Sequence, residues 1–361
     1  MQGLCLAGTK KYAQASAAFR RLLEEQPQFA AADRVLFELG AAETLDGKSA
    51  EAATTFSTLV ARFPNSAYAG EAWLERGESA WREKRWDEAA TAYQGAIAAA
   101  GSTPAGRRDL VVEQARHKLG WTRLMQQDHA AAAEAFAAQL AAAPQGAFAA
   151  DAQALLGEAL LRQDKVADAE RAFALALAPG VSLSSAELRD STFVRAAEAA
   201  ARQEKWQESL AHAERLLAAA PQSPLAPQAR YAAASARHNL GRLDEALADY
   251  RAIADGPRTE LAARARLREG EVLFERGDHR EAIKSFFKVA YGFGEKQAPA
   301  AFHPWQAQAT FEAARCFEVL AKPEQARTLY AELVDRYPDC QHVPAARKRL
   351  EILTPRGGPR P

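Results

Sequence analysis

Small and aromatic residues recur along this chain at a fixed spacing. An alanine is followed four residues later by phenylalanine or tyrosine, which places both on one face of a helix. The spacing occurs eight times, at Ala15/Phe19, Ala52/Phe56, Ala89/Tyr93, Ala132/Phe136, Ala169/Phe173, Ala246/Tyr250, Ala282/Phe286 and Ala326/Tyr330. A ninth copy, Ser209/Ala213, lies where the spacing predicts one but has lost the aromatic residue. The pattern predicts a series of amphipathic helices.

Glycine and proline also recur at fixed positions in this pattern. A small residue lies twelve positions before the alanine, at Gly40, Gly77, Gly120, Gly157, Ala197, Ala234, Gly270 and Ala314. A proline lies eight positions after the aromatic position in five copies, at Pro27, Pro64, Pro144, Pro221 and Pro338. Successive copies are 36 to 44 residues apart, whereas the internal spacing of twelve is constant. Each copy therefore predicts a helix, a short polar turn such as Asp46–Lys48, and a second helix that proline ends.

Close packing of two helices explains the small residues. We expect the glycine or alanine of the first helix to face the alanine of the second helix where the two cross. The aromatic residue, one turn further on, is expected to fill the gap towards the neighbouring helix pair.

These motifs resemble the tetratricopeptide repeat (TPR) signature, W-x2-L-G-x2-Y followed by A-x3-F and P. The L-G element is present at Leu39-Gly40, Leu119-Gly120 and Leu156-Gly157. Trp73 precedes Gly77 by four residues, as the aromatic residue of the signature does. The resemblance covers nearly the whole chain, but the period is 36 residues or more instead of about 34. Longer repeats with phrases such as Arg62–Tyr68 and Arg336–Asp339 are similar to bacterial cell-envelope TPR proteins of the Tol-Pal-associated and outer-membrane assembly types.

The resemblance implies an all-α fold, a right-handed α-solenoid of TPR-like antiparallel helix pairs. Residues 1–27 are expected to form a partial N-terminal repeat, because Gly3 takes the glycine position. Residues 28–341 are expected to form eight TPR-like repeats and residues 342–353 a capping helix. Residues 354–361 are expected to form a disordered tail.

Composition and charge narrow the classes of function. The chain has 46 basic and 46 acidic residues, so no overall basic field favours nucleic acid or an anionic membrane. No apolar run approaches the roughly 20 residues that span a bilayer, so we expect no direct membrane insertion. The three cysteines, Cys5, Cys316 and Cys340, predict neither a disulfide framework nor a zinc site. We expect the periplasm or cell envelope if a signal sequence precedes this chain, and the cytoplasm otherwise.

The first helices of a TPR solenoid line its concave face, and the resemblance implies that protein or peptide ligands lie there. The partner-binding residues predicted on this face are Arg34, Phe37, Trp81, Arg82, His117, Trp121, Arg162, Arg202, Tyr231 and His238. Trp81, His117 and Trp121 come from adjacent repeats, so they form either a platform for a peptide's apolar side chains or packing between repeats. Three pairs at i, i+4 are expected to stabilise their helices, at Glu78/Arg82, Glu158/Arg162 and Glu198/Arg202.

The linker over residues 292–304, which leads into Trp305, is a second candidate contact. Its apolar and histidine side chains are Phe293, Phe302 and His303, followed by Trp305. These residues form either an adaptable contact with a partner or a loop that folds back over the last repeats.

Motifs for catalysis and metal binding are missing from the sequence. The seven histidines show no metal-ligand spacing, and no nucleophile motif surrounds a serine or cysteine. We therefore predict no enzyme activity, no cofactor and no metal site. We predict instead a scaffold that binds protein or peptide segments in its concave groove, with assembly or coordination of cell-envelope complexes as its role. The alternative is a cytoplasmic adaptor or a regulatory arm of a longer polypeptide.

Overall fold

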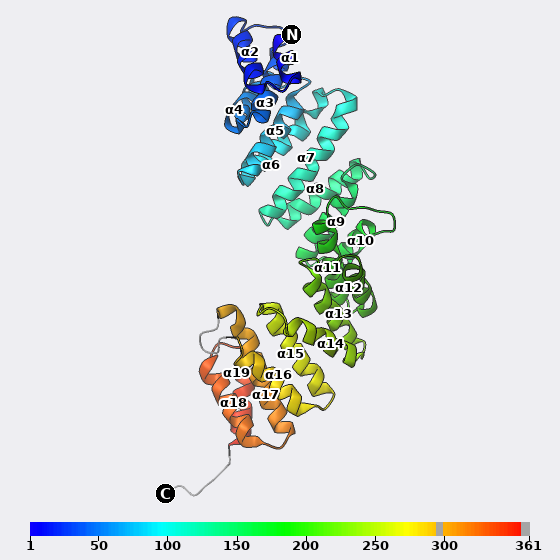
Figure 1. The fold of residues 1–361 in the computed structure, drawn as a ribbon, viewed down its shortest axis with the longest axis vertical. Helices are drawn as coiled ribbons and strands as arrows, with labels where there is room; N and C mark the ends of the chain where they lie inside the picture. The colour runs from blue at the N-terminus through cyan, green and yellow to red at the C-terminus, as the bar shows by residue number, and fades with distance from the viewer. Residues whose placement is uncertain (294–298, 355–361) are drawn as a thin grey trace. The chain divides into compact units, whose positions relative to one another are not determined.

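The protein is built from helices. A computed structural model describes residues 1–293 and 299–354, and these residues contain α-helices and short 3-10 helices but no strand. The chain divides into two compact units, residues 1–189 (unit 1) and 190–361 (unit 2). In each unit the helices form antiparallel pairs in chain order (Figure 1). The predicted fold class, an all-α solenoid of TPR-like helix pairs, is confirmed.

Consecutive helices pack against each other within each unit. Unit 1 contains α1 (Gln2–Gly8), α2 (Tyr12–Glu25), α3 (Ala32–Leu45), α4 (Ser49–Arg62), α5 (Ala69–Arg82), α6 (Trp86–Ala99), η1 (Ala100–Ser102), α7 (Ala105–Met125), α8 (His129–Ala142), α9 (Ala149–Arg162) and α10 (Val166–Ala176). The helix α11 (Ala186–Arg202) crosses from unit 1 into unit 2. Unit 2 continues with α12 (Trp206–Ala219), α13 (Ala226–Asn239), α14 (Leu243–Ala254), α15 (Glu260–Glu275), α16 (His279–Ala290), η3 (Ala300–Phe302), α17 (His303–Val319), α18 (Pro323–Arg336) and α19 (Val343–Leu353).

The odd-numbered α-helices are the first helices of the pairs, and they also contact one another. In unit 1, α5 touches α7 and α7 touches α9. In unit 2, α13 touches α15 and α15 touches α17. The helices α5, α7 and α9 in unit 1, and α13, α15 and α17 in unit 2, therefore each share a surface of first helices, where the sequence predicts binding residues.

In the pairs that have a glycine at the small position, the aromatic ring lies over that glycine. A Cβ added to Gly40 would lie 2.7 Å from the Phe56 ring, and one on Gly120 would lie 2.6 Å from the Phe136 ring. The glycine thus lies against the ring, because only a hydrogen leaves room for it there. That the small residue also faces the alanine of the second helix stays a prediction. Phe56 also joins a core cluster with Ala69 and Ala72 of the next pair, as expected.

The constant spacing of twelve follows from the turn between the two helices. Each turn contains a residue with positive φ, seven positions after the small residue: Lys10, Gly47, Lys84, Gln127, Asp164, Glu204, Gly241, Gly277 and Ala321. Their φ values lie between 55° and 82°. Because a left-handed residue at this place reverses the chain in the same way each time, the two helices of every pair keep one register.

The linker phrase Arg62–Tyr68 ties one pair to the next. The Ser66 hydroxyl donates to a carboxylate oxygen of Asp33 at 2.7 Å, and the backbone N–H of Tyr68 donates to the Ser66 hydroxyl at 3.1 Å. The linker is therefore anchored to the start of α3, the first helix of its own repeat.

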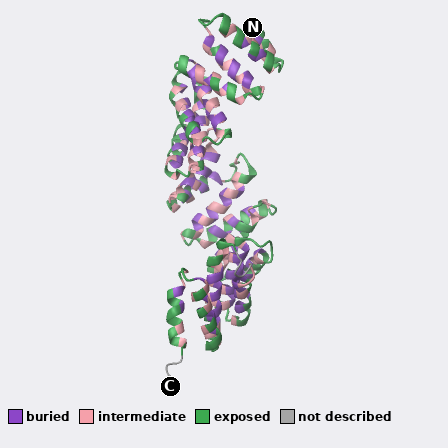
Figure 2. Cartoon of the chain, turned by 90° about the vertical axis from the view of Figure 1, so that its left-hand side faces the viewer, coloured by how far each residue is buried: buried purple, intermediate pink, exposed green. Residues whose placement is uncertain are grey.

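The described chain ends with α19. This helix packs on α18 and buries Val343 and Ala346. Most of its other residues are exposed, as Figure 2 shows for the helix next to the C-terminal label. Residues 355–361 of the predicted tail and residues 294–298 of the predicted contact linker lie outside the described residues.

Candidate functional site

Three rings pack together at equivalent places in three repeats. The first ring lies three residues before the small residue, the second sixteen after it and the third twenty-eight after it. We call each set an aromatic triad: Phe37/Phe56/Tyr68, His117/Phe136/Phe148 and Phe311/Tyr330/His342. The first and third rings are stacked with centroids 5.2, 4.9 and 4.9 Å apart, in that order. The first and second rings meet at a steep angle at 5.9, 5.9 and 5.5 Å.

His117 is sealed inside its triad and cannot belong to an open platform. The residue is 5% exposed. Its Nε2 accepts a hydrogen bond from the Trp121 indole N–H at 3.1 Å, so Nδ1 carries the proton and donates to Gln139 Oε1 at 3.3 Å. Burial lowers the pKa of His117 below its usual range, which keeps the ring neutral. The alternative reading, packing between helices, therefore describes His117.

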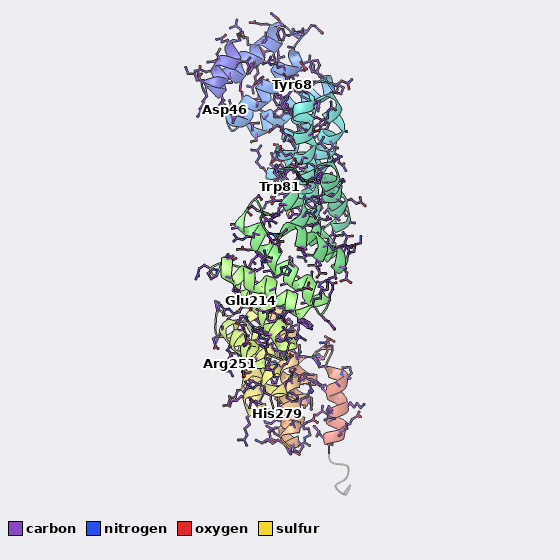
Figure 3. All side chains as sticks on the ribbon, turned by 90° about the vertical axis from the view of Figure 1, so that its right-hand side faces the viewer. Asp46, Tyr68, Trp81, Glu214, Arg251 and His279 are labelled. Carbon is purple, nitrogen blue, oxygen red and sulfur yellow. The ribbon has the colours of Figure 1, made fainter. Side chains whose placement is uncertain are left out.

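Trp81 and Trp121 pack into different core clusters. Trp81, labelled in Figure 3, lies edge-on against Trp86 with centroids 4.9 Å apart and borders the cluster around Tyr93. Trp121 borders the cluster around Phe136. Both tryptophans are half-buried. Each cluster also contains residues of the next repeat, Ala115 beside Trp81 and Leu155 beside Trp121, so both tryptophans pack between repeats.

Most of the predicted arginines are exposed and engaged with their own helix. Arg162 pairs with Glu158 at 2.8 Å and Arg202 pairs with Glu198 at 2.6 Å, which are two of the three expected i, i+4 pairs. The third pair does not form. Arg82 donates to the backbone carbonyl of Glu78 at 3.3 Å, while the Glu78 carboxylate accepts from Tyr93 and Lys118. Arg34 is exposed at the start of α3.

In unit 2 the structure brings together two residues from separate predicted sites. The Arg264 guanidinium lies 5.0 Å from the ring centroid of Tyr231 and 5.2 Å from that of Trp305. The Trp305 indole N–H also donates to Glu260 at 3.2 Å. His238, further along α13, lies 2.9 Å from a carboxylate oxygen of Glu275. These contacts connect α13, α15 and α17 across the surface of the first helices.

The predicted contact linker is partly helical. Phe293 and Phe302 stack with centroids 5.2 Å apart and pack on the core of unit 2, as expected for a segment that folds back. His303 and Trp305 belong to the first turn of α17 and not to a loop. His303 is exposed and borders a hollow of about 570 Å³ beside the α18–α19 connection.

A groove lies at the end of unit 2, formed by the first helices α15, α17 and α19 and the second helix α18. Its volume is about 460 Å³. We call it the C-terminal groove, lined by Phe274, Phe311, Arg315, Glu318, Val319, Tyr330, Ala345, Lys348, Arg349 and Ile352. Phe274 and Phe311 are half-buried, whereas Val319 is 54% exposed and Ile352 is 60% exposed.

The charged residues of the groove are held at its edges. Arg315 pairs with Glu312 at 2.7 Å, and its guanidinium lies 5.2 Å from the Phe274 ring centroid. Glu318 accepts from the Tyr330 hydroxyl at 2.6 Å and from Arg349 Nε at 2.9 Å. These bonds fix the edges while the apolar centre stays open.

The sequence prediction missed this groove. The predicted concave-face residues end with His238 on α13. Phe274 lies four residues after Gly270 and Phe311 three residues before Ala314, which are the positions that give Trp81 and His117 in earlier repeats. The available signal was therefore the same register, carried on to the last repeat.

The residue pattern matches a known family over most of the chain. A tetratricopeptide repeat profile matches residues 1–67, 46–104, 117–182, 194–260 and 251–302, and a second such profile matches residues 308–339. The chain belongs to the tetratricopeptide repeat family. Repeats of this family form scaffolds that bind peptide or protein partners and are generally not catalytic, and neither profile indicates an enzyme.

Solved TPR structures resemble the chain at low sequence identity. A TPR protein from Parabacteroides merdae is 12% identical, with 79% of this chain and 99% of that chain covered and a TM-score of 0.49. PilW, a type IV pilus biogenesis factor, is 18% identical, with 65% and 98% covered and a TM-score of 0.49. YrrB, described as a TPR protein with an unusual peptide-binding site, is 19% identical, with 60% and 99% covered and a TM-score of 0.41. No curated protein matches the sequence.

Cys316 of this TPR protein is buried on α17. Burial raises the pKa of the Cys316 thiol to about 12, which makes it a poor nucleophile. Among residues 1–293 and 299–354, no group of three or more His, Cys, Asp or Glu side chains is placed to hold a metal ion. The same residues contain no helix long and apolar enough to cross a bilayer.

Proposed function

We propose that this TPR protein is a scaffold that binds a short segment of a partner protein in the C-terminal groove. The observation that carries the proposal is the pair of exposed aliphatic side chains, Val319 and Ile352, above the half-buried rings of Phe274 and Phe311. Large apolar side chains gathered at a concave surface commonly mark interaction sites. A volume of about 460 Å³ admits a few side chains of a peptide and not a folded domain.

The groove contributes affinity by removing apolar surface from water. An aliphatic or aromatic side chain of the partner fits between Val319 and Ile352 and covers the edge of Phe311. Each apolar Å² removed from water contributes roughly 25 cal/mol, so a single anchor supplies only part of the binding free energy. Arg315 and Arg349 are held by their carboxylate partners, which reduces the entropy lost when they order around a ligand.

Selection from a random peptide library tests this function. Val319→Ser/Ile352→Ser removes the two apolar side chains at exposed sites, and Leu45→Ser, which changes a 62% exposed leucine of unit 1, is the matched control. We expect peptides that bind the wild type and Leu45→Ser but not the double variant. A selection that yields no peptide dependent on Val319 and Ile352 would overturn the proposed function. Circular dichroism and thermal unfolding of all three proteins establish that each is folded.

The cellular role that we propose is assembly or coordination of cell-envelope complexes. It is supported by the linker phrases Arg62–Tyr68 and Arg336–Asp339, which resemble those of bacterial envelope TPR proteins. Fractionation of the source cells, with an antibody against the chain, tests this role. We expect the protein in the periplasmic or envelope fraction. Recovery in the cytoplasm would favour the adaptor alternative. The predicted concave-face residues, from Arg34 to His238, do not line the C-terminal groove, and a binding role for those other than buried His117 stays a prediction.

A further inference from the structure

The C-terminal groove combines an apolar centre with an excess of positive charge at its edges. Its lining contains three basic residues, Arg315, Lys348 and Arg349, and one acidic residue, Glu318. Glu318 already accepts bonds from Tyr330 and Arg349, so its carboxylate is compensated within the groove. Arg315 is likewise paired with Glu312, so Lys348 carries the positive charge that remains at the groove, although the chain as a whole has no net charge.

Lys348 is the basic residue of the groove that is not already paired with a carboxylate of the described chain. It is exposed on α19, and it forms no ion pair with a residue in the described part of the chain. Arg315 and Arg349 are 47% and 45% exposed at their side chains, so each keeps N–H groups in water beside its carboxylate partner. A ligand carboxylate at this edge gains attraction without displacing an existing pair.

From this juxtaposition, and resting on the proposed function, we infer that the groove takes an acidic partner segment in which carboxylates flank an aliphatic or aromatic anchor. The anchor covers Val319 and Ile352, and the carboxylates face Lys348 and the outer edges of the two arginines. The sequence of the chain's own terminal residues 355–361 contains Arg356 and Arg360 and no acidic residue. Its charge has the same sign as that of Lys348, so this segment does not match the acidic ligand that we infer. Complementary charge gives specificity and speeds association, and the apolar anchor supplies the affinity.

The charge of the selected peptides is the first test. Among peptides that bind the wild type but not Val319→Ser/Ile352→Ser, we expect an excess of Asp and Glu over the unselected library, on either side of an apolar residue. Uncharged or basic peptides with the same dependence would overturn the inference and leave the proposed function standing. A library that yields no peptide with this dependence overturns both.

Binding measurements on one selected peptide give the second test. Fluorescence anisotropy compares the acidic peptide with its amide counterpart, in which Asp and Glu are replaced by Asn and Gln. We expect the amide peptide and the Lys348→Glu variant each to weaken binding by about fivefold to tenfold, and added NaCl to weaken the acidic peptide alone. Arg347→Glu is the matched control, since it makes the same charge change on α19 at a residue that does not line the groove.

Two results would contradict the inference directly. Equal affinity for the acidic and amide peptides, with no effect of Lys348→Glu, would mean that charge plays no part in recognition. A molecular mass that rises with protein concentration, and falls to the monomer in Val319→Ser/Ile352→Ser, would assign the groove to a second copy of this chain. Sedimentation or light scattering of the full chain distinguishes that case.

Discussion

The His117 triad of unit 1 and the Phe311 triad of unit 2 have the same geometry but different surroundings. Their first and third rings stack at 4.9 Å in both, and the histidine and phenylalanine exchange places between the two. His117 is almost fully buried, whereas Phe311 is half-buried and lines the C-terminal groove. One ring position therefore serves packing in one repeat and borders an open site in another.

The residue one helical turn after the first ring is one source of the difference. In unit 1 this residue is Trp121, which covers His117 and bonds to its ring. In unit 2 it is Arg315, which turns to Glu312 and Phe274 at the groove edge. The next first helix is the other source, because α9 adds Leu155 and Leu156 to the cluster that Trp121 borders, whereas α19 presents Lys348 and Ile352. An aromatic ring on a first helix thus indicates a binding site only where its neighbours leave it uncovered.

Removing the second ring of either triad is expected to have the largest effect on stability. Phe136 and Tyr330 are fully buried, and each packs against the first ring of its repeat. Phe136→Ala and Tyr330→Ala should each lower the free energy of unfolding by about 3 to 5 kcal/mol, because each leaves a cavity. Guanidinium-induced unfolding measures the effect. Wild-type stability in either variant would contradict the packing of the triads.

Removing the indole N–H of Trp121 is expected to have the next largest effect. Trp121→Phe leaves the Nε2 of buried His117 without its donor, which should cost about 1 to 3 kcal/mol. Trp305→Phe is the control, since the Trp305 indole bonds to Glu260, an exposed carboxylate that water can satisfy. Equal losses of unfolding free energy in the two variants would show that His117 does not need this bond.

Acid should destabilise the His117 triad through the histidine itself. Burial lowers the pKa of His117 in the folded protein, so below about pH 6.5 the unfolded chain takes up a proton that the folded chain does not. The free energy of unfolding should therefore fall as the pH is lowered from 6.5 to 5. The carboxylates of Asp151 and Glu113 act to raise the pKa of His117, whereas the charge of Lys118 acts with burial to lower it.

Two variants test whether His117 and His342 cause this pH dependence of the unfolding free energy. His117→Phe should flatten it, and His342→Phe should remove a further contribution, because burial also lowers the pKa of His342. Chemical unfolding at several pH values provides the measurement. A pH dependence identical in wild type and His117→Phe would mean that the ring is protonated in the folded protein.

Changes at the groove should have the smallest effect on stability. Val319→Ser and Ile352→Ser replace exposed side chains, so each should change the free energy of unfolding by no more than about 0.5 kcal/mol. Thermal unfolding measures this directly. A large loss of stability in either variant would show that these side chains pack within the fold and are not available to a ligand.

The fold was largely predictable because its signal is local. The glycine, the aromatic residue and the turn recur at constant spacing, and each fixes its own hairpin without help from distant residues. The burial of His117 was not predictable in the same way, because it depends on Phe148 of the following linker and on Gln139 of α8. The C-terminal groove depends on the meeting of α17 with α19, and no second helix follows α19 within the described residues to extend the periodic pattern.

Site-specific photo-crosslinking in the source cells tests most directly whether the C-terminal groove holds a protein partner. The photoreactive residue p-benzoylphenylalanine is placed at position 352 in the groove and, in a separate variant, at position 45, where an equally exposed leucine lies in unit 1. We predict a discrete protein adduct from position 352 that is absent from position 45 and is lost when Val319→Ser is added. No adduct from position 352, or the same adducts from both positions, would contradict the account.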